Sequence, residues 1–367
     1  MKTHRIIDEE DSVGHTVDDF FSRVASLQKE IAEQAAWPDI RNFVRYLHLG
    51  GKINSVIHHP SILKDVIQGK SPEEIRNKIR AKIRSQDIKG RGLGEEVPQF
   101  ISHLKKTSSP YHVNPNDKSK LNRLCYVEDL ENSEIREILS SLQRNFTRRS
   151  WEWALAVVAM RRFGKLNKDS KAIGIASSKE PLLFYLANHV NHVCATDLYD
   201  STIDRDTPLD FPENPEKYAP FPYKEDGLTA LRMDATNLEF PSESFDIAFS
   251  ISSIEHFGGE NHSGALRSLR EVERALKKGG IATISTEYIL NDKEHPEFFN
   301  RRTIYDDLIN KLDKLQLVEP LNLGITTRTL DTAMGVYDDT TGITHPHILL
   351  RYGDILFTSV MLVFQKQ

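Results

Sequence analysis

From Arg148 onward, short strand-like apolar runs alternate with longer runs of helical character. The strand-like runs read AIGIA, HVCATDL, FDIAFSI and IATISTEYI, and the helical runs include RRSWEWALAVVAMRRFG, PLLFYLANHV and HSGALRSLREVERALKKGG. Strands that alternate with helices form a largely parallel sheet with crossover helices. We therefore predict an α/β domain over residues 146–367, in which the later runs HILLRY and ILFTSVMLVFQ add an antiparallel pair of strands.

Residues 1–145 have a different pattern, mostly of helices and loops. Apolar residues between Val17 and Ile31 recur at helical spacing and give one apolar stripe. The run SPEEIRNKIRAKI starts with Ser71 as a helix cap and Pro72 at the first helical position. The stretch from Lys89 to Asp117 is rich in Gly, Pro and Ser, which indicates irregular structure. We therefore expect residues 1–145 to form a mainly helical N-terminal extension.

Composition excludes several classes of protein. The net charge of −5 argues against a dedicated nucleic-acid binder, which usually carries a basic excess. Two cysteines, Cys125 and Cys194, are too few for a disulfide framework or a cysteine zinc site. The polar and acidic start lacks the apolar core of a signal peptide, and the apolar runs are too short to span a bilayer. We therefore expect a cytoplasmic protein with no membrane span and no metal; its oligomeric state cannot be read from the sequence.

Residues that directly follow the predicted strands are the candidates for a ligand site. In a doubly wound sheet, ligands bind outside the carboxyl ends of the strands. The first strand-like run leads into the small residues of the loop 174–180, and small side chains allow a ligand to approach the backbone. Asp197 ends the second run, where an acid can accept hydrogen bonds from ribose hydroxyls. Asp234 follows the run ALRM, and the segment 252–256 follows FDIAFSI.

This order of features resembles the class I S-adenosylmethionine-dependent methyltransferases, from Trp151 to the strand near Thr286. The resemblance implies a Rossmann-like fold with a mostly parallel seven-stranded sheet and an antiparallel C-terminal hairpin. It also implies S-adenosylmethionine as the cofactor. In that family a glycine-rich loop follows strand one, an acid that ends strand two binds the ribose, and an acid after strand three contacts the adenine. Asp197 in ATDLY and Asp234 in RMDATNL match the two acids.

The first motif departs from the family pattern. Gly174 stands at the position of the usual acid, while Ala176, Ser178 and Glu180 stand at the glycine positions. A subset of bacterial methyltransferases, some associated with glycan biosynthesis, is similar in having a glycine followed by EPL, and the Glu180 carboxylate can replace the displaced acid. The resemblance thus implies a cofactor site made of nine residues: Gly174, Ala176, Ser178, Glu180, Asp197, Leu198, Asp234, Ala235 and Ser252.

A sparse catalytic signature is expected for this chemistry. Methyl transfer is an in-line displacement at an activated carbon, so holding the reactants in line is the main requirement. A general base is needed only where the acceptor loses a proton during attack. His256 is the candidate base, although a histidine that is merely hydrogen-bonded within its loop is the simpler interpretation. Trp151 and Trp153 lie on a predicted helix, where aromatic residues usually belong to the core.

We therefore predict a methyltransferase that acts on a small-molecule or sugar-containing acceptor. The first alternative is a non-catalytic methyltransferase-like protein that binds a partner or holds a complex together, which the altered first loop favours. The second alternative is a nicotinamide-dependent oxidoreductase. Enzymes of that class bind the pyrophosphate with a G-x-G-x-x-G loop. Because KAIGIASSKEP contains Gly174 as its one glycine, this alternative ranks last.

Overall fold

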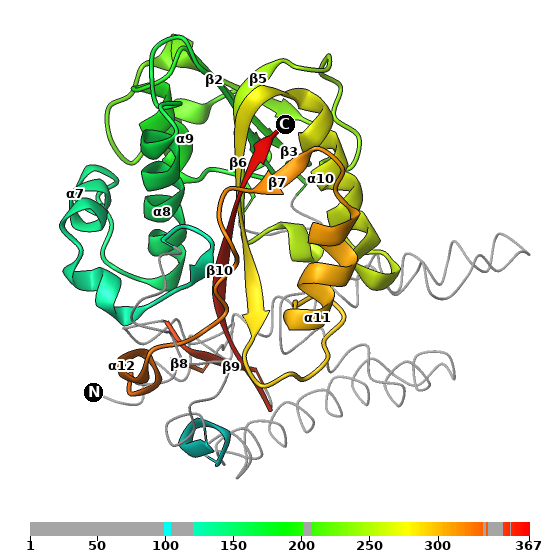
Figure 1. Ribbon diagram of the computed structural model, residues 1–367. Coiled ribbons are helices and arrows are strands. Elements are labelled where there is room, and N and C mark those ends of the chain that lie inside the picture. The colour runs from blue at the N-terminus through cyan, green and yellow to red at the C-terminus, as the bar shows by residue number, and fades with distance from the viewer. Residues whose placement is uncertain (1–98, 104–119, 201–206, 333–334, 337–347, 353) are drawn as a thin grey trace, which may run out of the picture. The chain divides into compact units, whose positions relative to one another are not determined.

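A mixed β-sheet organises the computed structural model, which describes residues 99–103, 120–200, 207–332, 335–336, 348–352 and 354–367 (Figure 1). Its parallel part has the order β4 Leu228–Arg232, β3 His192–Asp197, β2 Lys171–Ile175, β5 Phe245–Ile251 and β6 Leu276–Ile289. The chain runs from β2 outward to β3 and β4, then returns to continue with β5 and β6 on the other side. The switch point of the sheet therefore lies between β2 and β5, which confirms the predicted doubly wound fold.

The strand β10 Ile355–Lys366 completes the sheet by pairing antiparallel with β6. Its opposite edge is divided among three short antiparallel strands: β7 Leu315–Leu317, β1 Arg123–Leu124 and β9 Leu350–Tyr352. The β9–β10 pair confirms the antiparallel pair expected in the tail. The strands β4, β3, β2, β5, β6, β10 and β7 form the predicted seven-stranded sheet, while β1, β9 and β8 Gly335–Val336 are short additions.

Local sequence signals set the ends of the main helices. The helix α8 Arg148–Arg162 starts with a capping box, in which the side chains of Thr147 and Ser150 each accept the backbone N–H of the other residue. It ends before Gly164, whose φ of 62° stops the helix as expected. The helix α9 Pro181–Ala187 has proline at its first position, where the missing N–H costs nothing. The helix α10 Ser263–Ala275 leads into β6.

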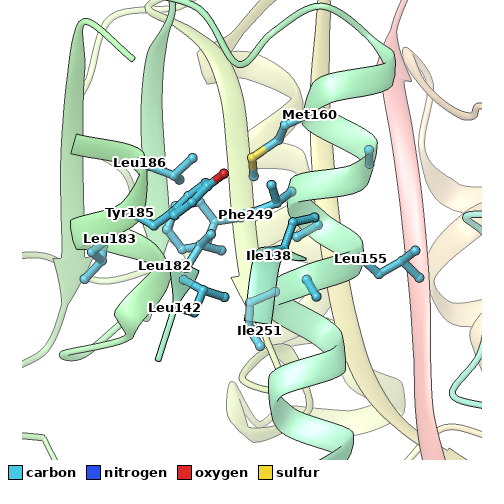
Figure 2. Close-up of a cluster of buried hydrophobic side chains, with 14 of the residues drawn as sticks. Ile138, Leu142, Leu155, Met160, Leu182, Leu183, Tyr185, Leu186, Phe249 and Ile251 are labelled. Atoms are coloured by element: carbon cyan, nitrogen blue, oxygen red, sulfur yellow. The ribbon is translucent and has the colours of Figure 1, made fainter. Parts of the chain in front are cut away.

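Helices cover both faces of the sheet (Figure 1). The helices α7 Ser133–Ser141, α8 and α9 lie on one face of the sheet, where their apolar side chains form the cluster in Figure 2 together with Phe249 and Ile251 of β5. The helix α10 packs on the other face in a second core. Both faces of β5 are buried, which explains why FDIAFSI is apolar throughout its length. Trp151 of α8 is fully buried, as expected of a core aromatic residue.

The described part of the β3–β4 connection contains 3-10 helical turns and a chain of aromatic contacts. The rings of Tyr199 and Phe211 stack at 5.5 Å, and Phe184 meets Phe211 at 6.1 Å and Tyr223 at 4.9 Å. The short helical segments of the chain are η1 Val127–Glu131, η2 Pro215–Tyr218, η3 Glu225–Gly227, η4 Ile254–His256, η5 Glu260–His262, α11 Arg301–Thr303, η6 Ile304–Leu308, η7 Ile309–Lys311 and α12 Thr327–Leu330. Of these, η4 directly succeeds β5 and therefore lies at the carboxyl end of the sheet.

Residues 120–145, which the sequence analysis assigned to the extension, belong to the same compact unit as the sheet. Within them β1 pairs with β10, and α7 packs against α8. The helices expected before residue 99 lie outside the described residues, so the division into 1–145 and 146–367 stays a prediction. Among the described residues, no helix is long and apolar enough to cross a membrane.

Candidate active site

The loop after β2 adopts a backbone conformation that favours glycine. Ala176 and Ser178 have φ angles of 48° and 42°, in the left-handed region. Each non-glycine residue there costs roughly 1–2 kcal/mol. Two backbone N–H groups of the loop donate to the end of β3: the Ser177 N–H to the Thr196 carbonyl at 3.0 Å, and the Ser178 N–H to Asp197 Oδ2 at 2.9 Å. The end of β3 thus maintains the strained loop at the end of β2.

Gly174 lies within β2, and its missing side chain is explained by packing. A Cβ atom at this position would lie 2.7 Å from Cζ of Phe249 and 2.7 Å from Oγ of Ser177. Its carbonyl accepts a hydrogen bond from the Thr196 hydroxyl at 2.8 Å. Phe249 of β5 and Ser177 of the following loop therefore leave no room for a side chain at position 174, which is sufficient to explain the glycine.

Glu180 is the N-cap of α9, and its carboxylate is unusual. The Oε2 atom is buried and has no hydrogen-bond partner among the described residues. Burial raises the pKa of this carboxyl to about 8; the Arg149 guanidinium lowers the pKa, and the Glu152 carboxylate raises it. The Trp153 indole lowers the same pKa, and Asp197 raises it. A carboxyl group with this pKa is poised to lose its proton when a cation binds beside it.

Asp197 and Leu198 lie at the carboxyl end of β3, next to the β2 loop. Oδ2 of Asp197 accepts the Ser178 N–H, and Oδ1 lies 3.5 Å from the Tyr199 nitrogen. Leu198 is 45% exposed, a high value for a large apolar residue beside a strand end. Tyr199 is buried, has a φ of 45°, and donates its hydroxyl to the Ser178 carbonyl at 3.3 Å. Two short segments from β2 and β3 are thus bonded together.

Asp234 and Ala235 follow β4, where the carboxylate of Asp234 closes a turn. Its Oδ1 accepts the Thr236 N–H at 2.7 Å and the Thr236 hydroxyl at 2.8 Å, and the side chain is otherwise exposed. Ala235 is buried. The structure therefore shows the turn-capping role of Asp234, and no described bond joins Asp234 to the other predicted site residues.

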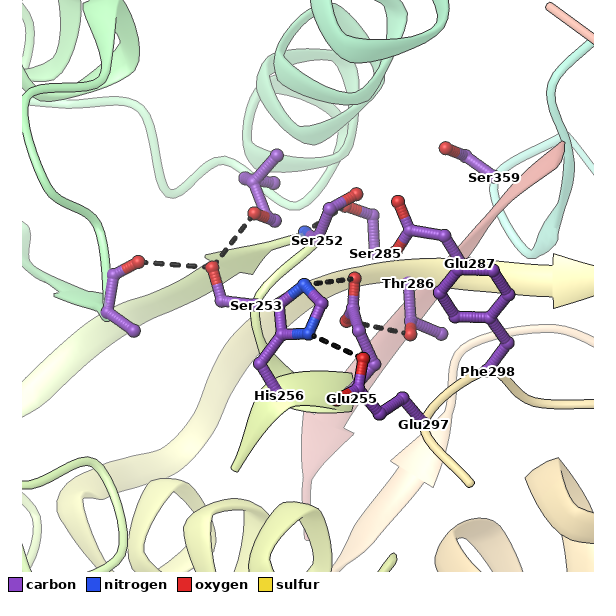
Figure 3. A network of polar contacts seen from close by, with 12 residues as sticks. Ser252, Ser253, Glu255, His256, Ser285, Thr286, Glu287, Glu297, Phe298 and Ser359 are labelled. Carbon is purple, nitrogen blue, oxygen red and sulfur yellow. Dashed lines mark hydrogen bonds and ion pairs between the residues drawn. The ribbon is translucent and has the colours of Figure 1, made fainter. Parts of the chain in front are cut away.

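The loop after β5 joins the β2 loop (Figure 3). The Ser253 hydroxyl lies 3.1 Å from the Ala176 carbonyl and 3.0 Å from the Ile251 carbonyl, and it can donate to either. Ser252 has a φ of 42°; its N–H donates to the Ser285 carbonyl of β6 at 3.0 Å. Three loops at the carboxyl ends of β2, β3 and β5 are therefore bonded in series.

His256 lies at the end of η4 and is largely exposed. Its Nδ1 is 3.2 Å from Oε2 of Glu297, and its Nε2 is 4.0 Å from Oε1 of Glu255. Glu255 is buried, and its Oε2 accepts the Thr286 hydroxyl at 2.9 Å. The side chain of His256 is bonded to Glu297 in the segment after β6 and not within its own loop, and the residue lies beside two carboxylates at the end of the sheet (Figure 3).

A buried ionic network beneath these loops was missed by the sequence analysis. Arg148 donates from Nη1 to Glu287 at 2.8 Å and to Glu152 at 3.1 Å, while the hydroxyls of Ser252 and Ser285 donate to Oε2 of Glu152 at 2.8 and 3.1 Å. The pKa of Arg148 is raised: burial opposes this, but the carboxylates of Glu287 and Glu152 outweigh it. A signal was available, because RRSWEW places charged residues at i and i+4 in an otherwise apolar helix.

The comparisons with known proteins point to one family of domains. Residues 174–284 match the model of a family described as a methyltransferase domain. Among solved structures, the YcgJ protein from Bacillus subtilis is 13% identical, with a TM-score of 0.36 over 58% of this chain and 98% of that one. An S-adenosylmethionine-dependent methyltransferase from Aquifex aeolicus is 13% identical, with a TM-score of 0.32 over 57% of this chain and 88% of that one. No curated protein matches the chain.

The matched segment begins in β2, at Gly174, and ends in β6. It therefore includes every strand end and loop from which the cofactor site was predicted. The match supports catalysis over the binding-module alternative, and S-adenosylmethionine over a nicotinamide cofactor. Residues 174–284 thus form a methyltransferase domain, and the chain is an enzyme that uses S-adenosylmethionine.

Proposed function

We propose that this methyltransferase acts on a small-molecule or sugar-containing acceptor, with the cofactor over the carboxyl ends of β2, β3 and β5. One observation carries the proposed site: the loops after these three strands are bonded to one another. Asp197 holds the Ser178 N–H, and Ser253 lies within hydrogen-bond distance of the Ala176 carbonyl. Such bonds fix the loops before a ligand arrives, which reduces the entropy lost on binding.

The described residues fit the cofactor. Asp197 and the exposed Leu198 would receive the ribose and one face of the nucleoside, and the loop at Ala176 and Ser178 would offer its backbone. Asp234 and Ala235 would border the adenine, and Ser252 would lie beside the methionine part. Asp197 has oxygen lone pairs beyond those that accept the Ser178 N–H, so its role in the loop does not prevent a bond to a ribose hydroxyl.

Glu180 supplies the strongest sign of a cationic ligand. Its buried Oε2 has no hydrogen-bond partner in the described residues, and a buried carboxylate without one is costly. The α-ammonium group of the cofactor carries the charge and the donors that this oxygen lacks. We assign Glu180 this contact, in place of the acid that Gly174 displaces.

S-adenosylmethionine, when bound, supplies a methyl group activated by a positive sulfur. The chain's own residues then orient the acceptor, which is where most of the rate enhancement of such a displacement arises. We propose His256 as the base for an acceptor that loses a proton, because its imidazole lies at the sheet end between Glu255 and Glu297.

Isothermal titration of the purified chain with S-adenosylmethionine and with S-adenosylhomocysteine tests the cofactor site. We expect micromolar binding of both, because the loops are already held in place. The absence of both binding heat and thermal stabilisation at millimolar ligand would show that the altered loop no longer binds cofactor. The non-catalytic alternative, a methyltransferase-like protein that binds a partner, would then be favoured.

A further inference from the structure

Arg149 of α8 lies at the point where the β2 and β5 loops meet, although the sequence analysis did not select it. Its Nη1 donates to the Ile251 carbonyl, the last of β5, at 2.8 Å. The same carbonyl lies 3.0 Å from the Ser253 hydroxyl, which is 3.1 Å from the Ala176 carbonyl of the β2 loop (Figure 3). The guanidinium is therefore fixed at the switch point of the sheet, where such folds bind their ligands.

Most of the donors of this guanidinium are available to a ligand. The Arg149 side chain is 42% exposed, and its further contact in the described chain is an ion pair of 3.7 Å between Nη1 and Oε2 of Glu152. That oxygen already accepts the hydroxyls of Ser252 and Ser285. A guanidinium has five N–H donors, and no described residue accepts a hydrogen bond from Nε or Nη2 of Arg149. These two nitrogens can bind a carboxylate through two parallel bonds.

A carboxyl group that lacks a donor lies within electrostatic range of Arg149. Glu180 is half-buried, and its Oε2 has no hydrogen-bond partner among the described residues. Burial raises the pKa of Glu180, and the Arg149 guanidinium is the strongest influence that lowers it. The Trp153 indole lowers this pKa as well, but one N–H can satisfy one lone pair of a carboxylate and leaves the others free. The site thus holds a cation with free donors beside an acid with a free oxygen.

This pair is the chemical complement of an α-amino acid, which carries a carboxylate and an ammonium group on one carbon. S-adenosylmethionine has such a group at its methionine end. We infer that Arg149 binds the carboxylate of the cofactor's methionine end, beside the contact between Glu180 and the ammonium group. This inference rests on the proposed function, since it adds a binding residue to the same cofactor site.

A structural role for Arg149 would have different consequences. An arginine that only holds the Ile251 carbonyl and Glu152 in place would, when removed, weaken every ligand of the site to a similar extent. An arginine that binds the carboxylate would, when removed, weaken only the ligands that carry one. Two ligands with the same adenosine part therefore distinguish the two roles.

The first test compares S-adenosylhomocysteine with 5′-methylthioadenosine, which lacks the amino-acid end. Isothermal titration of Arg149→Met should show S-adenosylhomocysteine binding weakened by at least about tenfold, because the lost hydrogen bonds join two charged groups. Binding of 5′-methylthioadenosine should be unchanged, which also shows that the variant is folded. Unchanged affinity for S-adenosylhomocysteine, or an equal loss of affinity for both ligands, would overturn the inference.

Two further variants complete this comparison. Arg149→Lys keeps the charge and a donor for the Ile251 carbonyl but loses the planar fork, so its affinity for S-adenosylhomocysteine should lie between those of wild type and Arg149→Met. It also replaces Arg149→Met if that variant does not fold. Arg162→Met, at an exposed position of the same helix, should bind both ligands as wild type does.

The second test separates the two ends of the amino acid. The decarboxylated analogue of S-adenosylhomocysteine keeps the ammonium group and lacks the carboxylate. Arg149→Met should bind this analogue at least as tightly as wild type does, whereas Glu180→Gln should bind it more weakly. Weaker binding of the analogue by Arg149→Met would show that the arginine does not act through the carboxylate.

Failure of this inference differs from failure of the proposed function. A wild-type protein that binds neither S-adenosylhomocysteine nor 5′-methylthioadenosine would refute the proposed cofactor site. A wild-type protein that binds S-adenosylhomocysteine, together with an Arg149→Met variant of the same affinity, would retain that site and remove Arg149 from it.

Discussion

The Ser178 N–H donates to Oδ2 of Asp197 at 2.9 Å, so the acid at the end of β3 also supports the loop at the end of β2. An acid that is proposed to bind the ribose and that also holds the neighbouring loop couples two parts of the cofactor site. Removal of this one carboxylate should therefore affect loop geometry and ligand contacts together.

Asp197→Ala should weaken S-adenosylhomocysteine binding by at least about tenfold, because a hydrogen bond to a charged group contributes roughly 1.5–3 kcal/mol. Isothermal titration measures the change, and circular dichroism shows whether the variant is folded. Asp226→Ala is the control, since the Asp226 carboxylate is 78% exposed and pairs only with Lys224 at 3.5 Å among the described residues. Wild-type affinity in a folded Asp197→Ala variant would remove Asp197 from the site.

Ser178→Gly should stabilise the protein by about 0.5–1 kcal/mol. Relief of the left-handed strain at φ 42° gains roughly 1–2 kcal/mol, and the greater freedom of glycine in the unfolded chain offsets part of it. Urea denaturation gives the free energy of unfolding. The same substitution at Ser140, an exposed residue of α7, should instead destabilise by about 0.5 kcal/mol. A loss of stability at both positions would mean that Ser178 is not strained.

Glu180 should make stability depend on pH. Burial raises its folded-state pKa to about 8 from an ordinary value of 4.5, so the folded protein binds more protons than the unfolded chain between these values. The stabilisation that results is complete below about pH 4.5 and is lost as the pH rises through about 8. Melting curves of wild type and Glu180→Gln from pH 5 to 9 should therefore diverge as the pH rises, with the variant relatively more stable at alkaline pH. Parallel curves would contradict this account.

Arg148→Met should destabilise by about 3–5 kcal/mol, because it leaves the buried carboxylates of Glu152 and Glu287 without their shared cation. Chemical denaturation would measure this loss. Arg162→Met, at an exposed position of the same helix, should stay within about 0.5 kcal/mol of wild type. Similar values for the two variants would mean that the buried network contributes little.

Much of the fold was predictable from the sequence because its signals are local. The apolar run FDIAFSI, the proline that opens α9 and the glycine that ends α8 each have one dominant structural solution. The sequence places Ala176 and Ser178 at glycine positions of the family motif, and both have a glycine-like backbone, although the residues themselves gave no sign that they would accept it.

The remaining parts depend on contacts between distant segments. The i, i+4 spacing of Arg148 and Glu152 is visible in the sequence, but nothing near Glu152 indicates that hydroxyls from the loop after β5, from β6 and from β10 would surround it. The packing of residues 120–145 with the sheet was not predictable for the same reason, because β1 is a two-residue strand whose partner lies near residue 360. The sequence is ambiguous at Asp234 for a different reason. Its bonds to Thr236 are local, but an acid that follows a strand has the same sequence pattern whether it caps a turn or binds a cofactor.

The strand β10 has a consequence for how this protein acquires its structure. It follows every other described strand along the chain, yet it lies inside the sheet, between β6 on one edge and β7, β1 and β9 on the other. One bond across this region, from the Val363 N–H to Oδ1 of Asn122, joins residues 241 positions apart. Contacts of such long range slow folding, because the entropy of closing the loop is lost before the contact forms. During synthesis, β10 follows every other described strand. The edges of β6, β7, β1 and β9 that pair with β10 therefore stay unpaired until β10 has been made.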